Sequence, residues 1–193
     1  MMGEGREPAG GFAGKVPGAA GLLMRRSRWR RCLAACGAGT VIGEGARVIG
    51  AGNVSIGSNV IMAGDSLISA RDGGKISIGD NVFIGKGSEL RAAGGVLKIV
   101  SGANIGSRCV ISAEGAIEIG PDVLIAAYGE LKSSESRLLS VGGGCWLGVR
   151  VRVTASVSIG SGSIIGAHSV VTEDIPSMAI AYGNPAKVMR RRT

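Results

Sequence analysis

Few residues in this chain could do acid–base or metal chemistry, and the single histidine, His168, sets the first limit. Histidine is the most common general base at neutral pH, because the imidazole group titrates in that range. One histidine cannot complete a zinc set, and the cysteines (Cys32, Cys36, Cys109 and Cys145) form no Cys-x-x-Cys pair. The sequence therefore predicts no metal site.

The formal net charge of +8 would suit a nucleic acid, a membrane surface or a phosphate-bearing ligand. The arginines gather at residues 25–31 and 190–192, where a solvated terminal segment is the plain alternative. No nucleic-acid-binding motif is visible, so no nucleic-acid partner is expected. The cysteines are expected to be reduced thiols, which predicts a cytoplasmic protein. No stretch approaches the about 20 apolar residues that a membrane-spanning helix needs.

A six-residue repeat organises most of the chain. From residue 141, aliphatic residues recur at intervals of six: Val141, Leu147, Val153, Ile159, Ile165 and Val171. A glycine follows most of them, and a small or compact residue comes four positions later. The same Ile-Gly unit recurs upstream at residues 42, 56, 78, 84, 105 and 119, with breaks at residues 72–75 and 92–97.

A period of six fits neither an α-helix nor a simple β-meander, but it fits a solenoid with three short strands per coil. The aliphatic side chains are expected to point inward, and the glycines to lie near the corners. Cys109 and Cys145 fall at the small inward position, which predicts buried packing residues. His168 falls at an outward position, where it is most simply a surface residue. The handedness does not follow from these residues.

The repeat divides the chain into four segments. Residues 1–21 are rich in Gly, Ala and Pro and are expected to be disordered. Residues 22–36 favour a helix, with Leu22, Arg26, Trp29 and Leu33 on one face. Such a helix could cap the open end of the solenoid, or it could rest on a membrane surface. Residues 37–176 are expected to form the solenoid, and residues 177–193 a tail.

Residues 145–190, which run without a gap from CWLGVRVRV to GNPAKVMR, resemble the hexapeptide-repeat acyltransferases. They are most similar to the galactoside, maltose and polysaccharide O-acetyltransferase group. The segment RRSRWRRCLAACGAGTVIGEGARV also resembles the start of sugar and cell-envelope members, so the resemblance covers about residues 24–190.

The resemblance implies an all-β, left-handed parallel β-helix with a short N-terminal helix and a C-terminal tail. It implies a homotrimer in which acetyl-CoA, the acyl donor, lies in a cleft between subunits. The implied acceptor is a hydroxyl of a sugar or cell-envelope glycan. The implied location is the cytoplasm or, if the basic helix contacts a membrane, its inner face.

Seven residues match the family's donor-binding positions. Trp146 lies at the acyl end of the cleft, Gly148 and Val149 where the backbone approaches the pantetheine arm, Ala167 and Thr172 along that arm, and Lys187 and Arg190 near the phosphates. A cation beside a phosphate is favourable, which supports the last pair. Two positions depart from the pattern: Val149 replaces a small polar residue, and Glu173 stands where a lysine is usual.

The catalytic histidine of the family normally lies in a loop before the Cys-Trp-Leu-Gly coil. The corresponding segment, residues 126–140, contains none. Glu130 matches that position and could act as the base if burial raised its pKa toward neutrality. The neighbouring Lys132 and Arg137 fit a solvated loop equally well. Without a tuned base, holding the thioester and the hydroxyl together would still give some rate.

Two functions therefore stay open at this stage. The first is an acetyl-CoA-dependent O-acetyltransferase, with acceptor contacts from residues 126–140. The second is a trimeric scaffold that has lost catalysis. A zinc hydratase on the same fold would need three histidine ligands.

Overall fold

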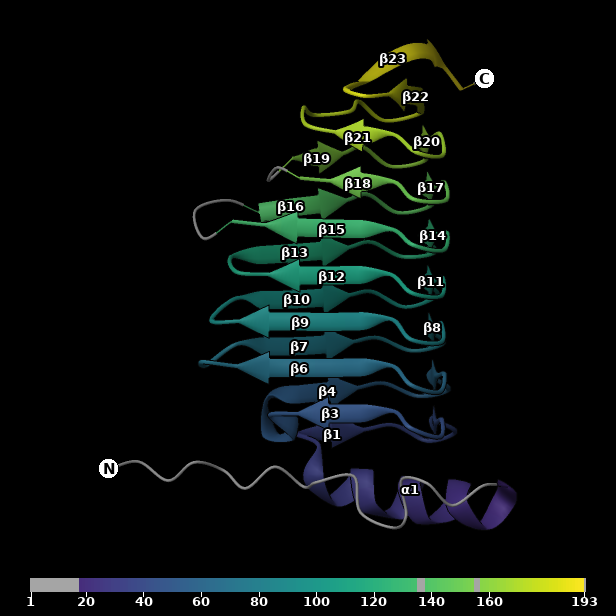
Figure 1. The fold of residues 1–193 in the computed structure, drawn as a ribbon, viewed down its shortest axis with the longest axis vertical. Coiled ribbons are helices and arrows are strands. Elements are labelled where there is room, and N and C mark those ends of the chain that lie inside the picture. The colour runs from purple at the N-terminus through teal and green to yellow at the C-terminus, as the bar shows by residue number, and fades with distance from the viewer. Residues whose placement is uncertain (1–17, 135–137, 155–156, 193) are drawn as a thin grey trace.

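The computed structural model describes residues 18–134, 138–154 and 157–192. In it the chain coils upward through three flat parallel sheets, one strand per sheet in each coil (Figure 1). This confirms the predicted parallel β-helix; the left-handed sense stays a prediction. Residues 1–21 were expected to be disordered: residues 1–17 lie outside the described residues, and residues 18–21 are helical, so the prediction was wrong for them.

The three sheets are called A, B and C here. Sheet A consists of β1 (Ala35–Cys36), β4 (Val54–Ile56), β7 (Lys75–Ile78), β10 (Val96–Ile99), β13 (Ala116–Ile119), β16 (Leu138–Val141) and β19 (Ser158–Ile159). Sheet B consists of β2 (Val41–Ile42), β5 (Ile61–Met62), β8 (Phe83–Ile84), β11 (Asn104–Ile105), β14 (Leu124–Ile125), β17 (Trp146–Leu147), β20 (Ile164–Ile165), β22 (Ala179–Gly183) and β23 (Ala186–Arg191). Sheet C consists of β3 (Arg47–Ile49), β6 (Leu67–Arg71), β9 (Glu89–Ala93), β12 (Val110–Ala113), β15 (Glu130–Ser133), β18 (Arg152–Val153) and β21 (Val170–Val171). A short 3-10 turn, η2 (Ala51–Asn53), separates β3 from β4.

The core is a set of aliphatic columns, because equivalent residues of successive coils pair in register. In sheet B the inward column runs through Ile42, Met62, Ile84, Ile105, Ile125, Leu147 and Ile165, all buried. Cys109 and Cys145 are buried at corners, as predicted, and burial raises the pKa of both thiols. These two cysteines therefore serve packing.

The helix α1 (Gly18–Cys32) covers the first coil at the N-terminal end (Figure 1). It begins and ends four residues earlier than the predicted 22–36, because Ala35 and Cys36 pair with β4 as the first strand. Trp29 and Leu33 are buried on the core, as their spacing predicted. The side chain of Arg25 is also buried, and its Nε donates to the carbonyl of Ile42 at 2.9 Å. The alternative of a solvated arginine segment therefore does not hold for Arg25.

The C-terminal segment extends sheet B. Strand β22 pairs in parallel with β20, and β23 then returns antiparallel to β22. The last residues therefore complete a sheet of the solenoid, where the sequence had predicted only a tail.

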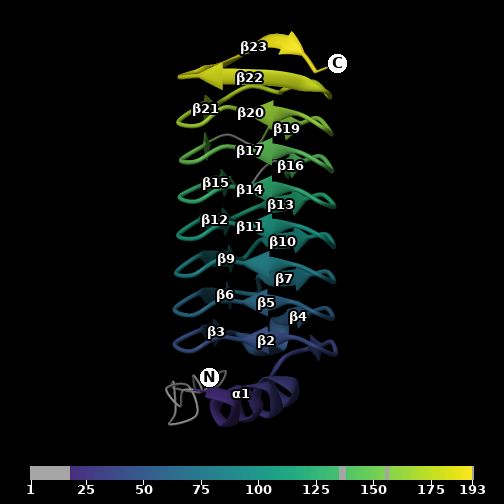
Figure 2. The ribbon, with the colours of Figure 1, turned by 90° about the vertical axis from the view of Figure 1, so that its right-hand side faces the viewer.

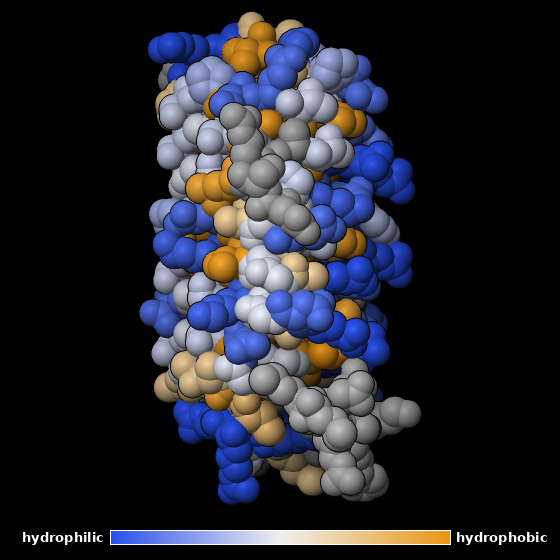
Figure 3. Space-filling view, turned by 90° about the vertical axis from the view of Figure 1, so that its left-hand side faces the viewer, coloured by the Kyte–Doolittle hydropathy of each residue, from blue (hydrophilic) through white to orange (hydrophobic). Residues whose placement is uncertain are grey.

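The side of the solenoid that carries the connections from sheet C to sheet A is mixed in hydropathy, mostly pale or hydrophilic with scattered apolar side chains (Figure 3). Among the described helices, none is long and apolar enough to cross a membrane.

Candidate functional site

The segment 126–140, expected to be a catalytic loop, is mostly part of the solenoid. Residues 126–129 form a corner, Glu130–Ser133 is β15, and Leu138–Val141 is β16. Leu131 and Leu139 point into the core and are fully buried. Residues 134–137 connect the two strands, and residues 135–137 of this connection lie outside the described residues.

Glu130 lies on the outer face of sheet C between two cations. Its carboxylate is 2.6 Å from Nζ of Lys132 and 3.0 Å from Nε of Arg152. The hydrogen bond from Lys132 is the main reason that the pKa of Glu130 is lowered. A general base working near neutral pH needs a raised pKa. The condition set for Glu130 as the base is therefore not met, and its position fits an ion-pair anchor.

Four of the seven donor-binding candidates lie together on two successive coils. Trp146 is on β17 with its side chain 52% exposed, and Gly148 and Val149 follow at the corner. A Cβ at Gly148 would lie 2.6 Å from the backbone nitrogen of Ala167, so only glycine allows this close approach. The backbone N–H of His168 donates to the carbonyl of Val149 at 2.8 Å, which fixes the two coils at this point.

The other three candidates lie farther toward the C-terminal end. Thr172 follows β21, and Lys187 and Arg190 are on β23. In sheet B, Trp146 pairs with Ile164, Ile164 with Ile180, and Ile180 with Arg190. Arg190 is therefore three strand spacings, or roughly 14 Å, from Trp146 along the axis. Both Nζ–carboxylate distances between Lys187 and Glu173 are 3.3 Å. Glu173 thus stands where the family usually has a lysine, and its carboxylate also pairs with Lys187.

A separate row of residues follows the B–C corner, the turn from sheet B into sheet C in each coil. In the later coils this row contains Arg108, Tyr128, Arg150 and His168, which the sequence analysis did not single out as a group. Each has a positive φ, and the backbone N–H of each later member donates to the preceding coil. The sequence does share one feature among them: each lies three residues after an inward aliphatic residue.

No group of three or more His, Cys, Asp or Glu side chains that could hold a metal occurs among residues 18–134, 138–154 and 157–192.

Comparison with known proteins places this geometry in a family. No protein-family model matches the chain. A probable acetyltransferase of Mycobacterium tuberculosis is 32% identical over 134 residues, which are 61% of this chain and 45% of that protein. The lipopolysaccharide biosynthesis O-acetyl transferase WbbJ of Escherichia coli is 30% identical over 145 residues, which are 63% of this chain and 74% of WbbJ. The chain thus spans less than half of the mycobacterial relative.

Solved structures share the fold at low identity. The UDP-N-acetylglucosamine acyltransferase of Campylobacter jejuni superimposes with a TM-score of 0.71 at 21% identity, covering 80% of this chain and 62% of that one. The N-acyltransferase AntD of Bacillus cereus, in complex with a dTDP-amino sugar and coenzyme A, gives 0.61 at 18% identity, covering 88% and 89%. Together with the match to WbbJ, the repeat and the three-sheet solenoid show that the chain belongs to the hexapeptide-repeat β-helix acetyltransferase family.

Proposed function

We propose that this protein is an acetyl-CoA-dependent O-acetyltransferase that acts on a hydroxyl of a sugar or cell-envelope glycan. The observation that carries the proposal is the close approach of Gly148 to Ala167 beside the exposed ring of Trp146. These are three of the positions at which the family binds its donor. The names of WbbJ, an O-acetyl transferase of lipopolysaccharide biosynthesis, and of AntD, solved with coenzyme A, support the glycan and the donor.

In the proposed reaction the acceptor oxygen attacks the thioester carbonyl. The carbon–sulfur bond breaks, an acetyl ester forms, and the acceptor proton ends on the sulfur of coenzyme A. Trp146 and the backbone at Gly148 and Val149 would hold the acyl end, and Arg190 would face the phosphates. Because the pKa of Glu130 is lowered, positioning of the two reactants carries most of the rate in this proposal.

We further propose a homotrimer whose clefts include the outer face of sheet B (Figure 2). The strand register aligns a row of outward residues there: Val41, Ile61, Phe83, Asn104, Leu124, Trp146, Ile164 and Ile180. All but Asn104 are apolar, and Ile61, Leu124 and Trp146 are each more than 40% exposed. An apolar face of this length beside the donor site favours a second copy of the chain as its partner.

The free cysteines are in keeping with a cytoplasmic location.

The first test measures acetyl-CoA binding by calorimetry and thiol release with a panel of sugars. We expect binding and turnover by the wild type, and loss of both in Trp146→Ala. Val96→Ala, which removes an equally exposed apolar side chain from sheet A, is the control. Failure of the wild type to bind acetyl-CoA would overturn the proposal.

Glu130→Gln, compared with Glu118→Gln, decides the role of the carboxylate, because both residues form ion pairs on the outer surface. We expect Glu130→Gln to retain most turnover. A collapse of turnover with acetyl-CoA binding intact would instead make Glu130 the base. Binding without turnover in the wild type would favour the scaffold that has lost catalysis, a reading supported by the paired states of Glu130 and Lys187.

Light scattering tests the shared cleft. A trimer is expected, and Phe83→Asp should dissociate it, because a charge would enter the apolar face. A monomeric wild-type protein would contradict the model.

A further inference from the structure

The B–C corner repeats one backbone conformation from coil to coil, and its left-handed position carries two kinds of side chain. In the first three coils this position is occupied by Gly45, Asp65 and Gly87. In the next four it is occupied by Arg108, Tyr128, Arg150 and His168, with φ between 56° and 62°. The backbone N–H at each position after the first donates, at 2.8–3.1 Å, to the carbonyl of the residue just before the corresponding position of the preceding coil, so the row is continuous.

Arginine and tyrosine are unusual at such a position. Glycine, asparagine and aspartate adopt a positive φ readily, whereas a bulky side chain there is strained. Along the chain the described non-glycine residues with positive φ are Asn59, Asp65, Asp72, Asn81, Asp122, Arg108, Tyr128, Arg150, His168 and Met178. Four of the five that are neither Asn nor Asp lie in this one row. Strain gathered at one place points to a functional role for the side chains.

Three side chains of the row, those of Arg108, Tyr128 and Arg150, are in contact. Nη1 of Arg108 donates to the hydroxyl of Tyr128 at 3.0 Å. The guanidinium carbons of Arg108 and Arg150 lie 5.8 and 5.4 Å from the centre of the Tyr128 ring. The ring therefore contacts a cation of the coil before it and a cation of the coil after it, and the two arginines stand about 10 Å apart along the axis.

These two cations also lack acidic partners. Several other cations of the described surface pair with an acid, as in Lys86–Asp65, Lys98–Glu118 and Arg152–Glu130. Within the described part of the chain, no ion pair joins Arg108 or Arg150 to a carboxylate. Their positive charge is balanced only by the faces of one aromatic ring, so a bound anion would complete it.

The arginine and tyrosine part of the row borders the candidate donor site. Arg150 follows Trp146 by four residues on the same coil and is adjacent to Val149. Arg190, the residue proposed to face the phosphates of the donor, lies beyond Trp146 toward the C-terminal end. Arg108 and Tyr128 lie in the opposite direction along the corner, between β11 and β12 and between β14 and β15.

We propose that Arg108, Tyr128 and Arg150 form a subsite for an anionic group of the acceptor, a carboxylate or a phosphate. Each guanidinium can donate two parallel hydrogen bonds to such a group. The Tyr128 hydroxyl, which accepts from Arg108, keeps its own proton to donate to the ligand. The acceptor class is thus an acidic sugar or sugar phosphate. That identity rests on the proposed acetyltransferase function, whereas the binding of an anion does not.

The test uses the full chain and measures binding by calorimetry at low salt. Trigalacturonate and UDP supply a carboxylate and a phosphate, and maltotriose is the neutral probe. Wild type is expected to bind at least one anionic probe more tightly than maltotriose. Arg108→Gln and Arg150→Gln should each weaken that binding about tenfold. Lys98→Gln removes the same charge from sheet A and should change it less than about twofold.

Several results would overturn the subsite. Equal losses in all three variants would mean general attraction to a basic protein, and equal affinity for maltotriose would mean no anion preference. Loss of acetyl-CoA binding in the arginine variants, with binding of the anionic probes unchanged, would assign the arginines to the donor. If wild type binds no acetyl-CoA but the arginine-dependent anion binding persists, the proposed function fails and the anion site stands. Thermal unfolding of each variant checks that the fold is kept.

Discussion

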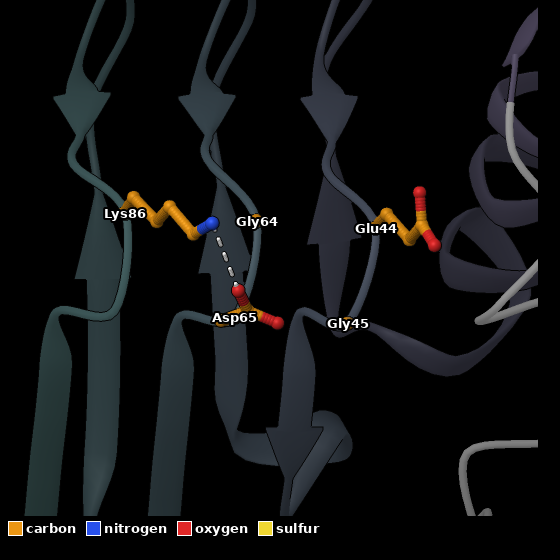
Figure 4. Close-up of a pocket in the computed structure, with 5 residues that line it drawn as sticks. All are labelled: Glu44, Gly45, Gly64, Asp65 and Lys86. Atoms are coloured by element: carbon orange, nitrogen blue, oxygen red, sulfur yellow. Dashed lines mark ion pairs between the residues drawn. The ribbon is translucent and has the colours of Figure 1, made fainter.

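The two halves of the B–C corner share one backbone and differ in chemistry. In the early coils the corner is lined by Glu44, Gly45, Gly64, Asp65 and Lys86, which border a shallow hollow of about 700 Å³ (Figure 4). There Nζ of Lys86 lies 3.4 Å from the Asp65 carboxylate, so the cation of this corner has an acidic partner. In the later coils, larger side chains occupy the same positions, and among the described residues no acid forms an ion pair with Arg108 or Arg150.

The difference separates what the solenoid needs from what a ligand site would need. A corner must reverse the chain in a few residues, and glycine or aspartate does this at little conformational cost. The early coils use these residues, so their corner is explained by folding alone. The later coils place arginine and tyrosine where folding does not favour them, which is why the proposed subsite is placed there.

The largest effect is expected from removing a favourable corner residue. Gly87→Ala should lower the free energy of unfolding by about 1–2 kcal/mol, because φ is +68° at this position. Steric contact is not the cause, since the new Cβ would meet only Cγ of Arg108 at an ordinary 3.6 Å. Thermal unfolding should show a Tm lower by roughly 2–8 °C.

Lys86→Ala, one residue earlier, is the matched control, because its ion pair with Asp65 is largely exposed and contributes little. If Gly87→Ala lowers the free energy of unfolding no more than Lys86→Ala does, a positive φ has little conformational cost at this corner. Arginine at this position in the later coils would then not indicate a functional role.

The converse substitution should have a smaller effect of opposite sign. Arg150→Gly relieves the left-handed strain and loses one cation–π contact, for a net gain of roughly 0.5 kcal/mol. The same variant should bind the anionic probes more weakly, which would separate stability from binding. Chemical denaturation and calorimetry on one preparation measure both quantities.

Arg152→Gly provides the contrast two residues away. Arg152 lies in β18 and donates to Glu130, so glycine there should destabilise the protein by about 0.5–1 kcal/mol. Destabilisation by both variants would show that the Arg150 side chain is needed for folding itself.

The sequence was sufficient for the fold because the solenoid repeats a local rule. Inward aliphatic residues at intervals of six identified the core columns, and the small inward position identified Cys109 and Cys145 as buried. The error at residues 126–140 arose where the rule is incomplete. Ala126 and Ala127 replace the usual glycine after Ile125, and no glycine follows Leu131, so strands β15 and β16 were taken for a loop.

The corner row was missed for a different reason. Arg108, Tyr128, Arg150 and His168 are separated by unequal lengths of chain, because the connections from sheet C to sheet A vary from coil to coil. Their common place after an inward aliphatic residue becomes a line in space only through the pairing of successive coils. The lowered pKa of Glu130 comes first from Lys132 on the same strand and in smaller part from Arg152, which belongs to the next coil.

The smallest effect concerns Glu130, whose ion pairs lie beside the later half of the corner. The hydrogen bond from Lys132 lowers the pKa of Glu130 in the folded protein below its unfolded value. Its contribution is therefore present above the unfolded pKa and is lost as the pH falls through the folded pKa. Glu130→Gln should be less stable than wild type by about 0.5 kcal/mol at neutral pH. Urea unfolding should show the two proteins converging in acid.

Glu118→Gln shows whether this pH dependence is specific, since Glu118 pairs with Lys98 alone and is more exposed. If the difference in stability between wild type and Glu130→Gln widened in acid, Glu130 would be protonated more readily in the folded protein, as a general base would require.

Removing the Glu130 carboxylate also frees Lys132 and Arg152 beside Arg150. If the later corner binds anions, Glu130→Gln should then bind trigalacturonate or UDP more tightly than wild type. Unchanged affinity would limit the site to the corner row itself.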